Sequence, residues 1–280
     1  MRLAVIADMH GNSHALEAIL ADAERVGVDA MAFLGDFVSD CADPEGVLAL
    51  AREAARAYPC WAVRGNREEY QVRYAEGQEA WRADSRTGSL LYTAQRLSAA
   101  DIAYFRRLPR SLGLSVDERP DILLCHGSPW ATRDLLTPGS ALLEQALSHA
   151  AQAEHALLLL GHCHVPFVLR KDGVLAVNPG AAGLPEDGDP RACWALATCE
   201  KGEWSAQLMR VKYDIAGAVR QMEERGLADM APWWARCIAH TMRTGVCLNM
   251  QLLSRAQALF EQGGQEMEIC FAQAGRELGL

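Results

Sequence analysis

The amino-acid sequence predicts an α/β fold with an all-helical C-terminal segment, and three observations lead to this prediction. Through residue 63, short apolar runs alternate with stretches whose apolar residues recur at helical spacing. Between residues 156 and 211, short apolar runs follow one another, with turn signals such as Lys171-Asp172-Gly173 between them. After Tyr213-Asp214 only helical spacing is found. The first pattern indicates parallel strands covered by helices, and the second indicates antiparallel hairpins added to a sheet.

The clearest start and stop signals lie in the first half of the chain. Asn12 precedes a helical pattern that Gly27 ends, and Asp43-Pro44 is typical of an N-cap with a first-turn proline, opening a helix to about Ala57. A further helix is expected over Ala141–Ala151, whereas residues 67–115 are less regular. The expected strands are Leu3–Ala7, Ala30–Leu34, Cys60–Val63, Ile122–Cys125, Ala156–Leu160, Phe167–Leu169, Val174–Val177, Cys193–Thr198 and Ser205–Val211.

Composition and charge argue against several classes of protein. The 280 residues carry a net charge of −9, which disfavours non-specific binding to nucleic acid or to an anionic membrane, because both require a basic surface. No run approaches the roughly 20 apolar residues of a membrane span, and the N-terminal MRLAVIADMHGN reaches charge and glycine too early for a signal peptide. The nine cysteines form no CxxC pair, which favours reduced thiols and a cytoplasmic protein.

Polar side chains stand at the carboxyl ends of the predicted strands. In an open α/β sheet these ends converge on the crevice where ligands bind. Seven oxygen and nitrogen ligands are too many for one tetrahedral zinc site, but they suit two divalent cations that share one carboxylate. The sequence therefore predicts a metal centre formed by Asp8, His10, Asp36, Asn66, His126, His162 and His164.

The segment LLLLGHCHVP, Leu157–Pro166, illustrates the pattern. A spacing of two puts His162 and His164 on the same side of an extended backbone and turns Cys163 away, so Cys163 is not expected to bind metal. An isolated Asp-x-His or Gly-Asn pair is more often structural than metal-binding. Five such signals in order, each after a predicted strand, favour the metal centre.

These motifs resemble the calcineurin-like metallophosphoesterase family, in particular its bacterial branch of small phosphodiesterase-like proteins. The resemblance covers about residues 1–211 and implies a four-layer αββα sandwich of two mixed sheets. We therefore expect a metallophosphoesterase domain at residues 1–212 and a C-terminal helical extension at 213–280. The motifs that carry the resemblance are DMHGN (8–12), GDFVSD (35–40), GNRE (65–68), HGSPW (126–130), GHCH (161–164), NPGAAG (178–183) and GDPRACWAL (188–196).

The resemblance also implies a role for each predicted ligand. One metal ion would be held by Asp8, His10 and His164, the other by Asn66, His126 and His162, with Asp36 between them. A hydroxide between the ions would attack phosphorus in line while both ions neutralise the phosphoryl oxygens. Asn66 is expected to contact the substrate phosphate as well. The expected catalytic residues are Asn66, His126 and Arg67.

Arg67 departs from the family pattern, because many members carry there a histidine thought to assist the leaving group. Arginine cannot act as a general acid near neutral pH, but it can clamp a phosphate or stabilise a leaving oxyanion. In the alternative, Arg67 points to solvent or pairs with Glu68 or Glu69. Loss of the acid would favour esters with good leaving groups. Two smaller departures are Cys163 in place of threonine and Ala181 in place of serine.

The sequence leaves several functions open. The leading expectation is a dinuclear metal-dependent phosphodiesterase acting on a small phosphate ester. Alternatives are hydrolysis of a dinucleoside polyphosphate or of a phosphomonoester, and a non-catalytic metal-binding scaffold. The ligand types suit Mn, Fe, Zn, Ni or Co without choosing among them.

Two segments have no assigned role in the sequence. The arginines of residues 67–110 either flank the crevice or pair with acidic neighbours on the surface, the latter being expected for most of them. The amphipathic tail, which contains Trp233 and Trp234, is expected to pack on its own domain. A homo-oligomer contact or a wall of the crevice are its alternatives.

Overall fold

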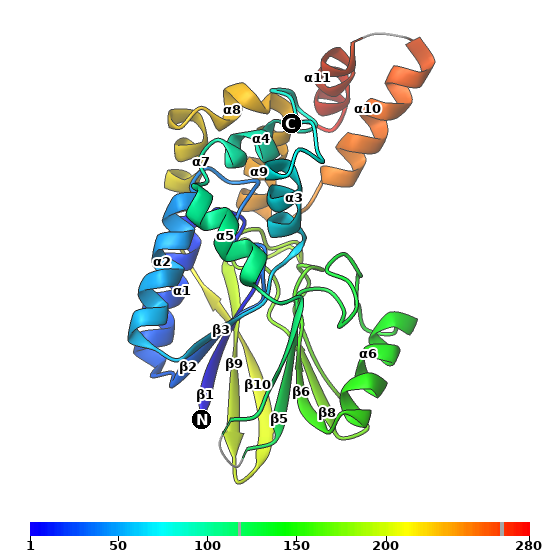
Figure 1. The fold of residues 1–280 in the computed structure, drawn as a ribbon. Helices are drawn as coiled ribbons and strands as arrows, with labels where there is room; N and C mark the ends of the chain where they lie inside the picture. Colours follow the sequence, from blue (N-terminus) through cyan, green and yellow to red (C-terminus); the bar gives the residue numbers. More distant parts are fainter. Residues whose placement is uncertain (117–118, 264–265) are drawn as a thin grey trace.

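Two five-stranded mixed sheets form the centre of the molecule, in a computed structural model that describes residues 1–116, 119–263 and 266–280 (Figure 1). The first sheet has the strand order β10-β9-β1-β2-β3. Its three N-terminal strands are parallel, and β9 and β10 form an antiparallel hairpin that joins the sheet beside β1. The strands are β1 (Arg2–Ile6), β2 (Ala30–Phe33), β3 (Cys60–Ala62), β9 (Ala192–Glu200) and β10 (Glu203–Val211).

The second sheet has the order β4-β5-β6-β8-β7. Its central strands β5, β6 and β8 are parallel, and the two edge strands run antiparallel to their neighbours. The predicted hairpins are confirmed as β7–β8 and β9–β10, although each belongs to a different sheet. The strands are β4 (Ser111–Leu114), β5 (Asp121–Cys125), β6 (His155–Leu159), β7 (Phe167–Lys171) and β8 (Val174–Asn178).

Helices cover the outer face of each sheet, so the predicted sandwich of four layers is confirmed. Helices α1 (Ser13–Val26) and α2 (Pro44–Ala57) lie on the first sheet, and α6 (Ala141–Gln152) lies on the second. The predicted caps are present: the side chains of Asn12 and Asp43 accept backbone N–H groups at the starts of α1 and α2, and Gly27 ends α1 in a left-handed conformation.

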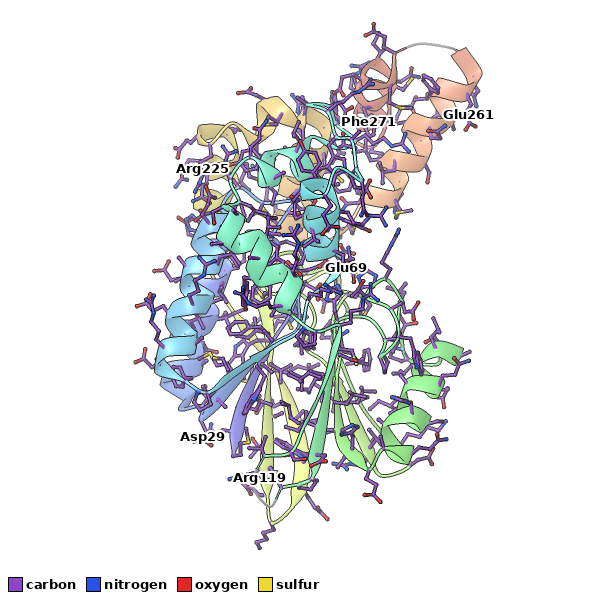
Figure 2. All side chains as sticks on the ribbon, in the orientation of Figure 1. Asp29, Glu69, Arg119, Arg225, Glu261 and Phe271 are labelled. Carbon is purple, nitrogen blue, oxygen red and sulfur yellow. The ribbon has the colours of Figure 1, made fainter. Side chains whose placement is uncertain are left out.

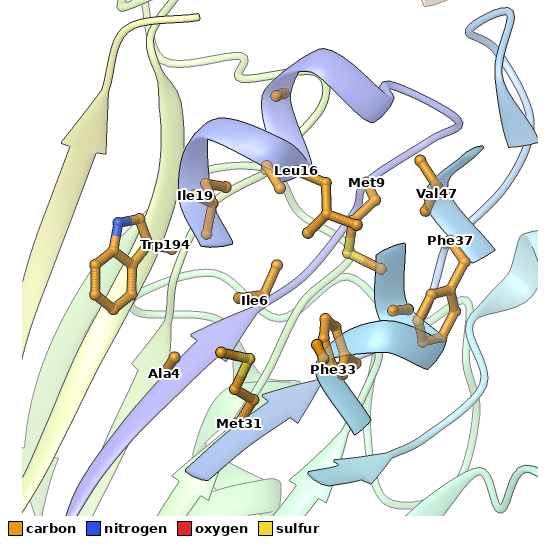
Figure 3. Close-up of a cluster of buried hydrophobic side chains, with 14 of the residues drawn as sticks. Ala4, Ile6, Met9, Leu16, Ile19, Met31, Phe33, Phe37, Val47 and Trp194 are labelled. Carbon is orange, nitrogen blue, oxygen red and sulfur yellow. The ribbon is translucent and has the colours of Figure 1, made fainter. Parts of the chain in front are cut away.

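Alternation along β1 divides its side chains between two cores. Ala4 and Ile6 point toward α1 and α2, where they pack with Leu16 and other buried residues (Figure 3). Leu3 and Val5 point toward the second sheet. A strand buried on both faces has no polar face, and this is why the sequence shows a continuous apolar run here.

Residues 66–107, which the sequence left without regular elements, form three helices. They are α3 (Asn66–Ala75), α4 (Gly88–Ala94) and α5 (Ala99–Arg107). Helix α3 gives little apolar signal because the residues it buries are polar, namely Asn66, Glu68 and Gln71. Helix α4 has only seven residues, too short for a clear periodic pattern.

The C-terminal extension is helical, as expected. Its first helices pack against the rest of the chain through a buried cluster that joins Tyr92 and Leu184 to Leu227, Trp234 and Ile238. The last two helices form a hairpin that packs on α9 and projects from the molecule (Figure 1). The helices are α7 (Ile215–Glu224), α8 (Leu227–Met230), α9 (Pro232–Thr244), α10 (Asn249–Gly263) and α11 (Met267–Glu277).

Polar contacts also join the extension to α2. Arg225, labelled in Figure 2, pairs with Asp43 and with Glu45 at the start of α2, and its backbone carbonyl accepts a hydrogen bond from Arg96. The extension therefore packs on the rest of its own chain, as expected. In residues 1–116, 119–263 and 266–280, each helix is too short or too polar to cross a bilayer.

Candidate metal centre

The structure brings all seven predicted ligands to one place, at the carboxyl ends of the parallel strands. Asp8 and His10 follow β1, Asp36 follows β2, and Asn66 begins α3 just after β3. His126 follows β5, and His162 and His164 follow β6. Both sheets contribute, so the site lies where their strand ends meet. The side chains form two groups, described below as the first and the second ligand group.

The first ligand group consists of Asp8, His10 and His164, whose ligand atoms all lie within 4.8 Å of one another. Nε2 of His10 lies 3.0 Å from Nε2 of His164, and the latter lies 3.5 Å from Oδ1 of Asp8. Two imidazole nitrogens that converge with a carboxylate oxygen are arranged as ligands of one cation.

The second ligand group consists of Asp36, His126 and His162, again within 4.8 Å of one another, with Asn66 beside them. Nε2 of His126 lies 3.1 Å from Oδ1 of Asn66 and 3.4 Å from Oδ2 of Asp36. The same Oδ2 of Asp36 lies 3.8 Å from His10 in the first ligand group. Asp36 is thus the carboxylate between the two groups.

Divalent cations fit this arrangement of buried charges. Oδ1 of Asp8 is fully buried and has no hydrogen-bond partner among the described residues. A buried carboxylate oxygen without a partner is costly unless a cation binds it. Nδ1 of His126 lies 2.7 Å from the backbone carbonyl of Leu34, so Nδ1 donates to that carbonyl, and Nε2 is the nitrogen that faces Asn66 and Asp36.

Most of the predicted ligands have a strained backbone. Asp8, His10, Asp36, His162 and His164 have positive φ angles, between 51° and 66°. Residues other than glycine rarely adopt this left-handed region, and such strain is concentrated at functional sites. His162 and His164 lie in the same crevice, as predicted, but an extended backbone is not the reason. The backbone at both residues is left-handed.

Cys163 lies away from the predicted metal ions, as expected. Its thiol lies 3.2 Å from Nδ2 of Asn178 and 3.4 Å from the carbonyl of Val165. Asn178 also donates to the carbonyl of Gly161, so it holds the GHCH turn from the end of β8.

The close packing of opposite charges shifts the pKa values. Burial raises the pKa of Asp36, but His126, His10 and Arg67 outweigh it and hold that pKa well below its ordinary value. Burial lowers the pKa of His126, but Asp36 and Asp8 raise it to about 9. For His162, burial and the charge of His126 together lower the pKa to about 4. At neutral pH His162 is therefore neutral and able to bind a cation.

The structure contradicts the alternative in which Arg67 points to solvent or pairs with Glu68 or Glu69. Its Nη2 lies 2.8 Å from Oδ2 of Asp40, and its Nε lies 4.0 Å from Oδ2 of Asp36. The side chain is only 20% exposed. Arg67 lies beside the second ligand group as a fixed cation.

Among the described residues, three other arginines of this stretch pair with acids, fewer than expected. Arg73 pairs with Glu79, Arg106 with Glu76, and Arg110 with Glu69.

Glu68 has a structural role that the sequence analysis missed. Its carboxylate accepts three backbone N–H groups, from Gly65 (2.7 Å), Phe37 (2.8 Å) and Asp36 (2.9 Å). It therefore ties the loop after β2 to the start of α3. The signal was present, since a glutamate at the third position of a helix is typical of a capping box.

Known proteins are similar to this chain in sequence and in fold. The family model of the calcineurin-like phosphoesterase superfamily domain matches residues 1–202. The uncharacterized protein MJ0912 of Methanocaldococcus jannaschii is 25% identical over 249 residues, which are 81% of this chain and 94% of that protein.

Two solved structures are similar over most of the chain. A metallophosphoesterase from Sphaerobacter thermophilus is 27% identical with a TM-score of 0.66, and the match covers 88% of this chain and 100% of that one. The hypothetical protein PH1004 from Pyrococcus horikoshii OT3, at 21% identity, has the same fold, with a TM-score of 0.71 over 83% of this chain and 97% of that one. Since the family model spans most of the sequence, the chain belongs to the calcineurin-like phosphoesterase superfamily and is a metal-dependent phosphate-ester hydrolase.

Proposed function

We propose that the protein is a phosphodiesterase with a centre of two divalent metal ions. The observation that supports this most directly is the pair of ligand groups with Asp36 between them. One ion would be held by Asp8, His10 and His164, the other by Asn66, His126 and His162, and Asp36 would contact both. Carboxylate, amide and imidazole ligands without thiolate suit Mn, Fe, Zn, Ni or Co.

When bound, the ions supply an activated water as nucleophile and neutralise charge on the phosphoryl oxygens. The side chains of His126 and Asn66 are oriented for this chemistry by their contacts. The Leu34 carbonyl holds the ring of His126 in one orientation, with Nε2 toward Asn66 and Asp36. Because Oδ1 of Asn66 faces His126, Nδ2 of Asn66 is available to donate a hydrogen bond to a phosphate oxygen.

Arg67 would bind the phosphate or the leaving oxygen. Its guanidinium remains charged at any working pH, and Asp40 keeps it beside Asp36. It cannot donate a proton to the leaving group, so the enzyme should prefer esters whose leaving groups depart as anions. Aryl phosphodiesters and phosphoanhydrides have such leaving groups.

Hydrolysis of an activated diester tests the proposal. Purified protein with Mn²⁺ should hydrolyse bis(p-nitrophenyl) phosphate, and Asp36→Asn or His126→Ala should abolish the activity while the protein stays folded. A panel with a phosphomonoester and a dinucleoside polyphosphate then ranks the substrate classes. Faster turnover of either would replace the diester in this proposal. An intact protein that binds Mn²⁺ and hydrolyses none of the panel would indicate a scaffold instead of an enzyme.

A further inference from the structure

Asp40 lies directly beside the first ligand group, although it is not among the seven predicted ligands. Its carboxylate is buried, and its Oδ2 lies 3.2 Å from Nδ1 of His10 and 2.8 Å from Nη2 of Arg67. Nδ1 is the ring nitrogen that lies away from His164, whereas Nε2 faces it. Asp40 therefore makes a close charge contact with the ring of His10 and an ion pair with the guanidinium of Arg67.

The other oxygen of Asp40 is held by the C-terminal extension. Trp234 on α9 donates its indole N–H to Oδ1 of Asp40 at 2.9 Å, and the Ser89 hydroxyl lies 3.4 Å from the same oxygen. The indole is buried in the cluster that joins the extension to α4 and to the loop after β8. Its N–H is thus fixed in place by packing, and the position of Asp40 depends on it.

A second carboxylate faces the other histidine of the first ligand group. Oε1 of Glu186, in the loop between β8 and β9, lies 3.1 Å from Nδ1 of His164. Both imidazoles of the first ligand group therefore have Nδ1 beside a carboxylate, and the carboxylate beside His10 is bound by a residue of the extension.

The second ligand group is built differently. Nδ1 of His126 lies against the backbone carbonyl of Leu34, within the sandwich itself. The histidines that Asp40 and Glu186 contact, His10 and His164, thus belong to the first ligand group, while Asp40 also pairs with Arg67 beside the second.

We propose that the C-terminal extension completes the metal centre: Trp234, acting through Asp40, holds His10 in position for the ion of the first ligand group. Trp234 and Asp40 are positioning residues, since they act through the histidine. This inference rests on the proposed function, because it requires that the two ligand groups bind metal.

Trp234→Phe tests the inference, because it removes the indole N–H and keeps an aromatic ring. Mn²⁺ binding to metal-free protein would be measured by titration calorimetry. The wild type should bind two ions. The variant should bind one of them about 10–100-fold more weakly, which is the usual effect of losing an outer partner of a metal ligand. The affinity for the other ion should not change.

The chain offers a matched control in the neighbouring residue. Trp233 is on the same helix, but its ring packs against Arg236 and Gly275 on the side of the C-terminal hairpin. Trp233→Phe should leave both Mn²⁺ affinities unchanged.

A double-mutant cycle separates positioning from a general loss of packing. Asp40→Asn should weaken the same ion, and adding Trp234→Phe to it should weaken binding little further, because the indole acts through the carboxylate. Fully additive losses of affinity would overturn the inference. So would a Trp234→Phe protein that binds two ions as the wild type does, with the proposed function left intact. A wild type that binds no Mn²⁺ would overturn both.

Discussion

Arg67 brings a permanent positive charge to the place where a histidine is common in the family. The structure pairs it with Asp40 and places it near Asp36, so it acts from a fixed position beside the second ligand group. A fixed cation stabilises charge on a departing oxygen but supplies no proton. The proposed preference for leaving groups therefore depends on this single residue.

Arg67→His should change that preference. An imidazole can protonate a departing oxygen, and general acid catalysis contributes about 10²–10⁴-fold. The variant should therefore gain at least about tenfold in kcat/KM for alkyl diesters relative to aryl diesters. Rates measured over a series of diesters with increasing leaving-group pKa show the change as a flatter slope. Arg67→Lys, which keeps the charge, is the control, and an unchanged ranking in Arg67→His would contradict this role of Arg67.

Metal binding should release protons. Burial lowers the pKa of His126 and of His164, but Asp36 and Asp8 raise the first to about 9, and Asp8 and Glu186 raise the second well above its ordinary value. Both rings are therefore protonated near neutral pH without metal, and an ion must displace those protons. Affinity for Mn²⁺ should fall as the pH is lowered below 9, by about tenfold per pH unit for each displaced proton.

Calorimetry in two buffers of different ionisation enthalpy measures this release directly. His162, whose pKa lies near 4, should contribute no proton at neutral pH. Binding heats that are the same in both buffers would show that no proton is displaced.

At the scale of elements, the loops after β2 and β3 must approach one another closely. Gly35 has a φ of 88°, and a Cβ on it would lie 2.4 Å from the backbone nitrogen of Gly65. Glu68 then ties both loops together through three backbone N–H groups. Asp36 and Asn66, which belong to these loops, are placed by this contact.

Gly35→Ala should therefore destabilise the protein strongly. The left-handed backbone costs about 1–2 kcal/mol, and the clash with the neighbouring loop adds about 1–3 kcal/mol, so the free energy of unfolding should fall by about 2–5 kcal/mol. Gly27→Ala is the control, because Gly27 has a φ of 78° and a Cβ on it would meet no other atom within 4 Å among the described residues. Gly27→Ala should lower the free energy of unfolding only by the cost of the left-handed backbone. Urea denaturation measures the free energy of unfolding of both variants, and equal decreases would show that the loop contact is unimportant.

The sequence predicted those elements whose signals are local. Caps at Asn12 and Asp43 and the apolar run of β1 gave helix and strand bounds within one or two residues. Helix α3 and the edge strand β4 were missed, because α3 buries polar side chains and β4 is half-exposed. The assignment of strands to sheets depends on long-range pairing, such as that of β1 with β9, which no local pattern records.

The seven ligand-type residues were predicted because each follows a strand, a position that the sequence shows. No role at the site was predicted for Asp40 and Glu186, because their partners come from distant segments. Trp234 lies 194 residues beyond Asp40 in the chain, and only the folded structure brings them together. The ring orientation of His10 and His164 is likewise a property of tertiary contacts.

At the scale of the whole molecule, the sandwich and the extension share one buried cluster beside the candidate metal centre. The match to the Sphaerobacter thermophilus metallophosphoesterase covers 88% of the chain, more than residues 1–212 make up, so that likeness reaches into the extension. The division at residue 212 remains a prediction about the chain. Trp234 is the residue through which the two parts would act together.

Anomalous X-ray diffraction from crystals grown with Mn²⁺ tests the central claim most directly, because it locates each ion. The account predicts two peaks roughly 3.5–4 Å apart, the spacing of two-metal sites, one within each ligand group and with Asp36 between them. Crystals that show no peak among these seven side chains, or a single peak that Asp36 does not contact, would contradict it.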